Sequence, residues 1–257
     1  MKVSETKVSE LEQYRHHPIA SFFPSIFGDA SKIRLEHILR TNERRIGRGY
    51  VLALEGGQNQ TVLCVLKGWL AVGKTLSDGE KQIIDFVLPG DILDPTAADG
   101  ESSVLQIEAL TDVSVTILSD ATWQEMTREW PDLHRLTVAV AAASRARQAG
   151  RMLRLGKGSA RMRLAYALLE LCIRLRAIGR SAEGCSSFHV PLTQQHLGDF
   201  AGLTSVHVCR TLRRLAQQGV IAVEDHMDIR ILDVAALAEI ADVEPEALSR
   251  EIVPAAA

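Results

Sequence analysis

The segment Leu192–Ile221 reads LTQQHLGDFAGLTSVHVCRTLRRLAQQGVI. Thr193 is a good N-cap for a first helix that ends near Ala201. Gly202 suits a tight turn after this helix, because glycine adopts a positive φ at little cost. The beginning of the segment therefore predicts a short capped helix followed by a sharp change of direction.

A second helix is predicted directly after the turn. Thr204 caps it, it runs to about Gln218, and Gly219 is its stop. Two short helices that meet at a glycine-containing turn are typical of a helix-turn-helix, whose second helix enters the DNA major groove. The following residues, Ala222–Leu232, form two short strand-like runs around a polar turn, which predicts a wing and favours DNA binding.

The two faces of the second helix differ in polarity. At about 100° per residue, Val208, Leu212 and Leu215 share one face, which must pack on the first helix. On the opposite face, Arg210 can reach guanine O6 and N7, and Val206 can touch a thymine methyl group. The alternative is a helical hairpin with a solvated arginine face. The residues predicted to face the groove are Val206, Cys209, Arg210, Arg213 and Gln217.

Charge is distributed unevenly along the chain, although the formal net charge is only −3. Gln82–Thr127 contains nine acidic residues and no Lys or Arg, whereas Arg145–Arg180 contains ten Lys and Arg and a single acid, Glu170. A basic segment next to a helix-turn-helix favours contacts with DNA phosphates over a merely solvated helix face.

Length and composition restrict the class of protein. A chain of 257 residues with 46% hydrophobic residues is expected to form two domains, or one large one. Met1–Ser21 lacks an apolar core, and the largely apolar stretch Leu136–Ala143 is too short to span a bilayer, so we expect a soluble cytoplasmic protein. We find no P-loop, GxSxG or HExxH motif, so no enzyme activity is expected.

The cysteines do not predict a metal site. They have no CxxC or CxxxxC spacing, so neither zinc nor an iron–sulfur cluster is indicated, and in a reducing cytoplasm we expect thiols. The four are Cys64, Cys172, Cys185 and Cys209.

The upstream half has a strand-like pattern. Short apolar runs alternate with turn signals such as Gly56-Gly57 and Asp78-Gly79, which predicts an antiparallel sandwich or barrel. The alternative is a β domain with a purely structural role, which binds no effector. The predicted strands are Tyr50–Leu54, Thr61–Leu66, Leu70–Val72, Gln82–Val87, Val104–Ala109 and Val113–Leu118.

Helices should follow the strands. Ser119–Trp130 is predicted as a short helix, and Pro131 suits the first turn of a long one that runs to about Leu155. Gly156-Lys157-Gly158 should break it, and Ser159–Arg176 should be a further helix with leucines on one side and Cys172 beside them, buried. The expected domains are residues 1–130, a helix over 131–156, and residues 157–257.

The long helix carries a stripe of mixed side-chain size, with small members that allow close helix approach. We interpret the stripe as a dimer seam rather than as packing against the chain's own β domain, because DNA-reading helices of this type usually act in pairs. Its members are Leu136, Val140, Ala143, Gly150 and Leu153.

The order of these elements and several local phrases resemble the cyclic AMP receptor protein/FNR (CRP/FNR) superfamily of bacterial transcription regulators. The phrases are VLKGWL (Val65–Leu70), SDG (Ser77–Gly79), LPGDI (Leu88–Ile92), ALTDV (Ala109–Val113) and the segment Leu192–Ile221. The resemblance implies an α+β homodimer: an antiparallel β-roll of the cupin-like, cyclic-nucleotide-binding type, a dimerisation helix and a C-terminal winged helix-turn-helix. It also implies double-stranded DNA as a partner, and RNA polymerase if the chain is an activator.

The resemblance extends to candidate DNA-contacting residues. The family's base-contacting positions fall on Ser205, Val206, Cys209 and Arg210, of which the helical face selects the last three. Many members carry glutamate where this chain has Val206, so its half-site should differ from theirs. The full candidate set adds Arg213 and the two N-caps, Thr193 and Thr204.

The ligand signatures of the family are missing. Cyclic-AMP-binding members use a glutamate at a position that falls on or beside Pro95 here, and an Arg-Ser pair at a position that falls near Ser103-Val104. This chain has no Lys or Arg between Gln82 and Thr127. A buried phosphate without a cation is costly, so we expect no cyclic nucleotide, although backbone amides at a helix start can also bind phosphate. No cysteine precedes Cys64, which excludes the family's N-terminal [4Fe–4S] cluster.

Other functions find weaker support. Only the presence of His16, His17, His37 and His134 supports haem, and a single histidine is more often a surface or core residue, so no cofactor or metal is predicted. The acidic loop with Asp94, Asp99 and Glu101 is more simply a solvated loop than a metal site. Two alternatives stay open: a regulator controlled by oxidation of Cys209 or Cys185, and a ligand-binding scaffold whose helix-turn-helix serves protein contacts.

Overall fold

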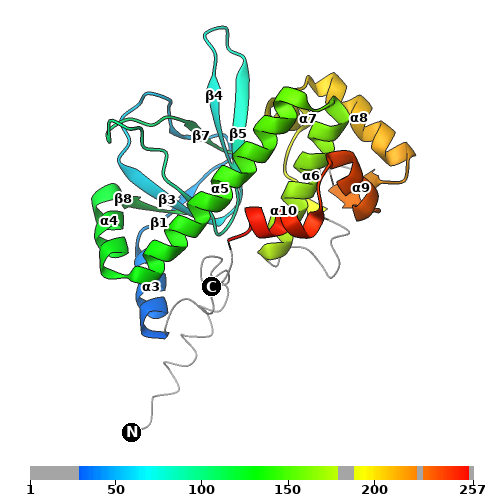
Figure 1. Cartoon of the computed structure of the whole chain (residues 1–257). Helices are drawn as coiled ribbons and strands as arrows, with labels where there is room; N and C mark the ends of the chain where they lie inside the picture. Colours follow the sequence, from blue (N-terminus) through cyan, green and yellow to red (C-terminus); the bar gives the residue numbers. More distant parts are fainter. Residues whose placement is uncertain (1–28, 179–187, 225–227, 255–257) are drawn as a thin grey trace.

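The structure, a computed structural model, describes residues 29–178, 188–224 and 228–254. It has an N-terminal β domain and a C-terminal helical domain, and the long helix α5 (Pro131–Lys157) extends from one to the other (Figure 1). The β domain contains two four-stranded antiparallel sheets, ordered β1-β8-β3-β6 and β2-β7-β4-β5. Their strands are β1 Glu43–Ile46, β2 Val51–Ala53, β3 Thr61–Lys67, β4 Leu70–Thr75, β5 Lys81–Val87, β6 Ile92–Leu93, β7 Gln106–Ala109 and β8 Val113–Ser119.

Strand β3 shows why the apolar runs of this half do not simply alternate with polar residues. Leu63 and Val65 face the core between the two sheets, whereas Val62 and Cys64 face a second core beneath the helices. A strand that is buried on both faces reads as a continuous apolar run, as TVLCVL does.

The predicted strands are present, with changes at their ends. The run expected to start at Val104 enters the sheet only at Gln106. Strands β1 and β6 were not predicted: β1 reads ERRI, and its pairing with β8, not its own pattern, makes it a strand. Pairing partners far away in the sequence leave no local signal of this kind.

Three helices pack against the β domain: α3 (Asp29–Thr41), α4 (Asp120–Glu129) and α5. Ser119 caps α4 by accepting a hydrogen bond from the N–H of Thr122, and Pro131 occupies the first turn of α5. The long helix continues through Gly156 and Lys157 and ends before Gly158, about half a turn later than predicted.

The predicted dimer seam on α5 is wrong. Leu136, Val140 and Ala143 are buried within the chain itself, with exposed fractions of 0%, 7% and 3%. Gly150 lies against the Tyr166 hydroxyl, and Leu153 stands apart from the others at 60% exposed. Periodicity correctly placed most of these residues on one face, but this face covers the outer side of β3 and the C-terminal domain.

The C-terminal domain is built around α6 (Ala160–Ala177), whose N-cap Ser159 accepts from the N–H of Met162. Leu164, Leu168, Leu171 and Leu175 are buried as predicted. The helices α9 and α10, which follow the wing, were not predicted. The other elements are β9 Phe188–His189, α7 Gln194–Ala201, α8 Ser205–Gln217, β10 Ile221–Glu224, β11 Asp228–Ile231, α9 Val234–Ala241 and α10 Pro245–Ile252.

One cysteine departs from the expectation of four thiols. Cys172 is buried, as predicted, but it is disulfide-bonded. Cys64 and Cys209 are free, and burial raises the pKa of the Cys64 thiol to about 12. Cys185 lies outside the described residues.

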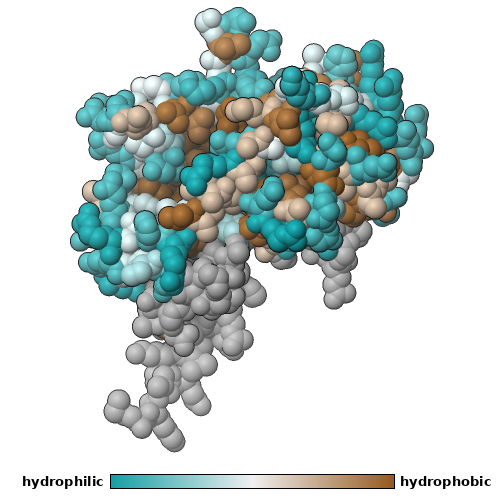
Figure 2. All heavy atoms as spheres, viewed as in Figure 1, coloured by the Kyte–Doolittle hydropathy of each residue, from teal (hydrophilic) through white to brown (hydrophobic). Residues whose placement is uncertain are grey.

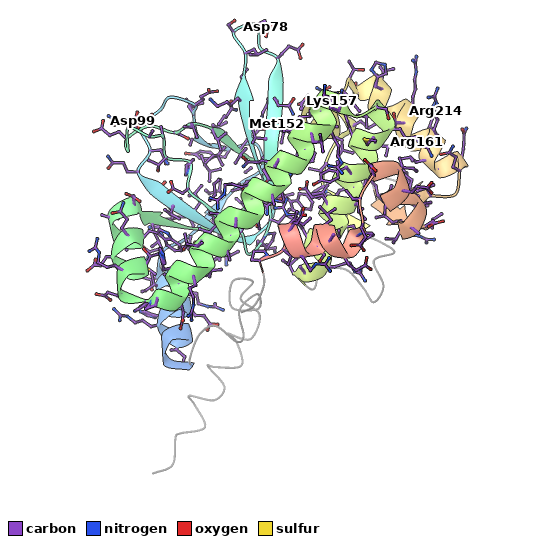
Figure 3. All side chains as sticks on the ribbon, in the orientation of Figure 1. Asp78, Asp99, Met152, Lys157, Arg161 and Arg214 are labelled. Atoms are coloured by element: carbon purple, nitrogen blue, oxygen red, sulfur yellow. The ribbon has the colours of Figure 1, made fainter. Side chains whose placement is uncertain are left out.

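Four arginines of the basic segment do not have the role that its position suggests. Arg147, Arg151, Arg154 and Arg174 are 4–8% exposed. Three of them pair with acidic residues inside the protein, and Arg154 donates to the carbonyls of Ala241 and Asp242. These arginines are therefore unavailable for DNA phosphates, whereas Lys157 and Arg161 of the same segment are exposed (Figure 3).

Candidate DNA-binding surface

Helix α7 begins at the predicted residue. The Thr193 hydroxyl accepts from the N–H of His196, and Nδ1 of His196 accepts from the N–H of Thr193, which forms a reciprocal capping box. Nδ1 must be unprotonated to accept this bond. Burial lowers the pKa of His196, which also favours the neutral imidazole. Thr193 itself is exposed.

The turn between α7 and α8 depends on two glycines. Gly202 ends α7 in the left-handed conformation, with φ 62° and ψ 45°, as predicted. Gly198 was not predicted to matter: a Cβ at this position would lie 2.4 Å from the carbonyl oxygen of Leu203. The chain therefore folds back against the backbone of α7, and this close approach requires a residue without a side chain.

We expect Gly198→Ala to destabilise the protein and to weaken DNA binding, because the turn must move away from the added methyl group. The cost in free energy of unfolding should be about 1–3 kcal/mol, the usual cost of overpacking, measured by urea unfolding. Gly47→Ala is the matched control, since a Cβ at Gly47 has no neighbour within 4 Å. A stabilised Gly198→Ala variant, the normal outcome for a glycine inside a helix, would contradict this description of the turn.

Helix α8 has the predicted faces. Thr204 caps it by accepting from the N–H of His207, and Val208, Leu212 and Leu215 are buried against α7 and α6. Thr211, which the apolar pattern missed, is buried as well and its hydroxyl donates to the carbonyl of His207. A threonine can satisfy its hydroxyl within the helix in this way and still lie on the apolar face.

The opposite face of α8 is open. Val206 is 57% exposed, Arg210 and Arg213 are exposed, and Ser205 and Cys209 are partly exposed. Strands β10 and β11 pair antiparallel beside this helix, as expected for a wing, and the residues between them lie outside the described part of the chain. The structure thus presents all the candidate DNA-contacting residues on, or at the N-terminal ends of, α7 and α8, which lie side by side (Figure 1).

Arg163 links this surface to the end of α5. Its Nε donates to the carbonyl of Gly158 at 3.0 Å and its Nη1 to the carbonyl of Gly202 at 3.3 Å. The guanidinium therefore joins the break between α5 and α6 to the turn before α8. The sequence contains no signal for this contact, because the partners are 39 residues apart.

In the loop where the family resemblance implies a cyclic-nucleotide site, hydrogen bonds join the chain's own groups. Ser103 is 2% exposed, and its hydroxyl donates to the carbonyl of Leu105. The Asp99 carboxylate, labelled in Figure 3, accepts from the N–H groups of Glu101 and Ser102 and from the Ser102 hydroxyl. These hydrogen bonds lower the pKa of Asp99 to about 2, so an incoming phosphate would meet a carboxylate.

Within residues 29–178, 188–224 and 228–254, no group of three or more His, Cys, Asp or Glu could hold a metal ion. No helix in this part of the chain is long and apolar enough to cross a bilayer.

Two family models match separate parts of the chain. The model of the cyclic nucleotide-binding domain matches residues 43–129, and the model of the Crp-like helix-turn-helix domain matches residues 162–240. The matched ranges contain the β domain and the helix-turn-helix, which are the parts that the sequence pattern singled out.

The chain also resembles characterised proteins over most of its length. It is 29% identical over 189 residues to the nitrogen fixation regulation protein FixK of Rhizobium meliloti, which covers 74% of this chain and 82% of that one. It is 28% identical over 198 residues to the transcriptional activator protein Anr of Pseudomonas aeruginosa, with 77% and 80% covered.

The solved structure of FixK2 from Bradyrhizobium japonicum has a similar fold. It superposes with a TM-score of 0.69 at 28% identity, and the alignment covers 77% of this chain and 96% of FixK2. The domain order, the two family models and these relatives agree with one another. The chain belongs to the CRP/FNR family of transcription regulators.

Proposed function

We propose that the protein binds an inverted-repeat DNA operator as a homodimer and regulates transcription from it. The observation that carries the proposal is the exposed face of α8, with Arg210 at its centre and the helix held from behind by a buried apolar face. A dimer would place two such helices in successive major grooves about 34 Å apart.

Each candidate residue has a role in this proposal. Arg210 donates two hydrogen bonds to a guanine, and Val206 contacts a thymine methyl group. Ser205 and Cys209 flank them at the base edges, and Arg213 lies one turn further along the helix. Thr193 and Thr204, at the N-termini of α7 and α8, lie where backbone N–H groups are available for DNA phosphates.

The dimer contact is assigned to the face of α5 that points away from its own chain. Successive exposed residues recur about once per turn along this face, and half of them are alanines that allow close approach of a second helix. Val138 is 51% exposed and Met152 is 72% exposed, and tan and brown atoms follow α5 in Figure 2. The members of this outer stripe are Val138, Ala141, Ala142, Arg145, Ala149 and Met152.

The experiment that tests the proposal is selection of bound sequences from random duplex DNA with the purified chain, without added ligand. Two identical half-sites in inverted orientation, about one helical turn apart, are expected. A single half-site bound by a monomer at full affinity would contradict the proposal.

Relatives named as transcriptional activators suggest the direction of regulation. An activator has RNA polymerase as a partner and acts in the cytoplasm, where the template lies. Transcription in vitro from a template with the selected site should therefore rise when the protein is added. These relatives are regulators rather than enzymes, and they favour a DNA-binding regulator over a scaffold or a cysteine-switched protein.

We expect no binding of cyclic AMP or cyclic GMP. The ribose-binding carboxylate is replaced by Pro95, which is buried, and the backbone N–H groups of the loop already bind Asp99. Titration calorimetry at sub-millimolar nucleotide should show no saturable heat. Tight binding of either nucleotide would instead indicate a phosphate site made of backbone amides elsewhere in the β domain.

A further inference from the structure

A cluster of buried charged side chains joins the β domain to α5 and α6. Asp85 of β5 lies at its centre, with a side chain 6% exposed. Its Oδ2 accepts from Nε and Nη2 of Arg147 at 3.1 and 3.0 Å. Its Oδ1 lies 3.1 Å from Nη1 of Arg174 and 3.4 Å from Nη1 of Arg151. Burial raises the pKa of Asp85, but the three guanidinium charges outweigh burial and hold the pKa well below its usual range.

A β-bulge in β5 directs this carboxylate toward the helices. Asp85 pairs with Val72 and Ile83 with Gly73, so Ile84 is an extra residue in the ladder. The carbonyl of Ile84 accepts from Nη2 of Arg151 at 2.8 Å. The carbonyl of Phe86 accepts from Nη2 of Arg174, also at 2.8 Å. Strand β5 therefore offers a carboxylate and two carbonyl oxygens to the guanidinium groups of α5 and α6.

The charges within the cluster balance. Glu170 of α6 is 0% exposed, and its Oε1 lies 2.6 Å from Nη1 of Arg151. Oδ2 of Asp91 lies 2.6 Å from Nη2 of Arg174. The three acidic residues thus face three arginines. A buried cluster of this kind is tolerated because each charge has a partner, and removal of one partner leaves another charge uncompensated.

Strand β5 also contacts α7, the first helix of the helix-turn-helix. Nε2 of Gln82 donates to the carbonyls of Asp199 and Phe200, the last turn of α7, at 2.5 and 3.2 Å. The Phe200 ring lies 4.6 Å from the Phe86 ring and 4.8 Å from the Arg151 guanidinium. Contacts therefore lead from Asp85 through Arg151 and Phe200 to α7, which packs on the DNA-reading helix α8.

We propose that Asp85 is a positioning residue for DNA recognition: its bonds to Arg147, Arg151 and Arg174 fix the orientation of the helix-turn-helix on the β domain. The proposal rests on the DNA-binding function above. Without these bonds the C-terminal domain samples several orientations. Only the fraction of molecules with both α8 helices correctly placed then binds the operator, and the apparent affinity falls by this fraction.

The test compares Asp85→Asn and Gln82→Ala with the wild-type full-length chain on the selected operator duplex. Asp85→Asn keeps the side-chain size and removes the charge, and it should weaken binding roughly tenfold or more. Gln82→Ala removes the hydrogen bonds to the carbonyls of α7 without leaving a buried charge unpaired. This variant should therefore fold normally and bind the operator several-fold more weakly. Hydrogen exchange should become faster in α7 and in the Gly202–Ser205 turn of both variants, while β3 and β8 stay protected.

Glu129→Gln is the matched control, because Glu129 of α4 pairs with Arg34 of α3 at the surface, far from α7 and α8 (Figure 1), and this variant should bind DNA normally. Unchanged affinity and exchange in both test variants would overturn the inference. It would also be overturned if Asp85→Asn exchanged faster throughout the protein and Gln82→Ala bound normally, because the cluster would then only stabilise the fold. A wild-type chain that selects no duplex would instead refute the proposed function, and the inference with it.

Discussion

Replacement of Arg210 by alanine should weaken operator binding by about 1–3 kcal/mol for each half-site, because two hydrogen bonds to one guanine are lost. In a dimer the loss applies twice. The guanidinium is exposed on the middle of α8, so its removal leaves no cavity and should not change the free energy of unfolding. Fluorescence anisotropy on the selected duplex and on duplexes with single base changes gives both the affinity and the base preference.

The base preference identifies the role of Arg210. If it reads a guanine, the variant should lose preference at one position of each half-site and keep it elsewhere. Equal weakening on all sequences would show that Arg210 contacts a phosphate and that the assignment is wrong. Arg250→Ala is the control, because Arg250 is an exposed arginine of the same domain that lies on α10 and not on α8.

Replacement of Ala149 by glutamate should convert the dimer to monomers. Ala149 lies in the C-terminal half of the outer stripe of α5, between Arg145 and Met152, where a parallel helix pair would bring both copies together. Two carboxylates buried at such a contact each cost several kcal/mol in desolvation, and they repel one another. Sedimentation velocity should show monomers, and affinity for the inverted repeat should fall by roughly 10²–10⁴-fold, because binding of the second half-site is no longer intramolecular.

Ala98→Glu is the matched control for this prediction. It introduces the same side chain at another exposed alanine, in a loop of the β domain, and should leave the oligomeric state unchanged. An Ala149→Glu variant that stays dimeric and binds the repeat normally would place the dimer contact on a different surface.

Much of the candidate DNA-binding surface could be predicted because its signals are local. The caps Thr193 and Thr204, the turn at Gly202 and the two faces of α8 all depend on residues within a few positions of each other. The need for glycine at position 198 could not be predicted, because it comes from the carbonyl oxygen of Leu203, which lies against Gly198 only in the folded turn.

By itself, the sequence determined most of the helices and strands and the apolar side of α6 and α8, since periodicity and capping act over one or two turns, but it did not predict β1, β6, α9 or α10. Only the tertiary structure decided what each face meets. Leu136 and Val140 cover β3 rather than a second chain, and the outer stripe became apparent only when the inner face was assigned. The acidic and basic segments were also visible in the sequence. The sequence did not show that Asp85 binds Arg147, which is 62 positions away. A charge pattern specifies which groups need partners, whereas the chain's path through space decides whether a partner is a DNA phosphate or a carboxylate of the same protein.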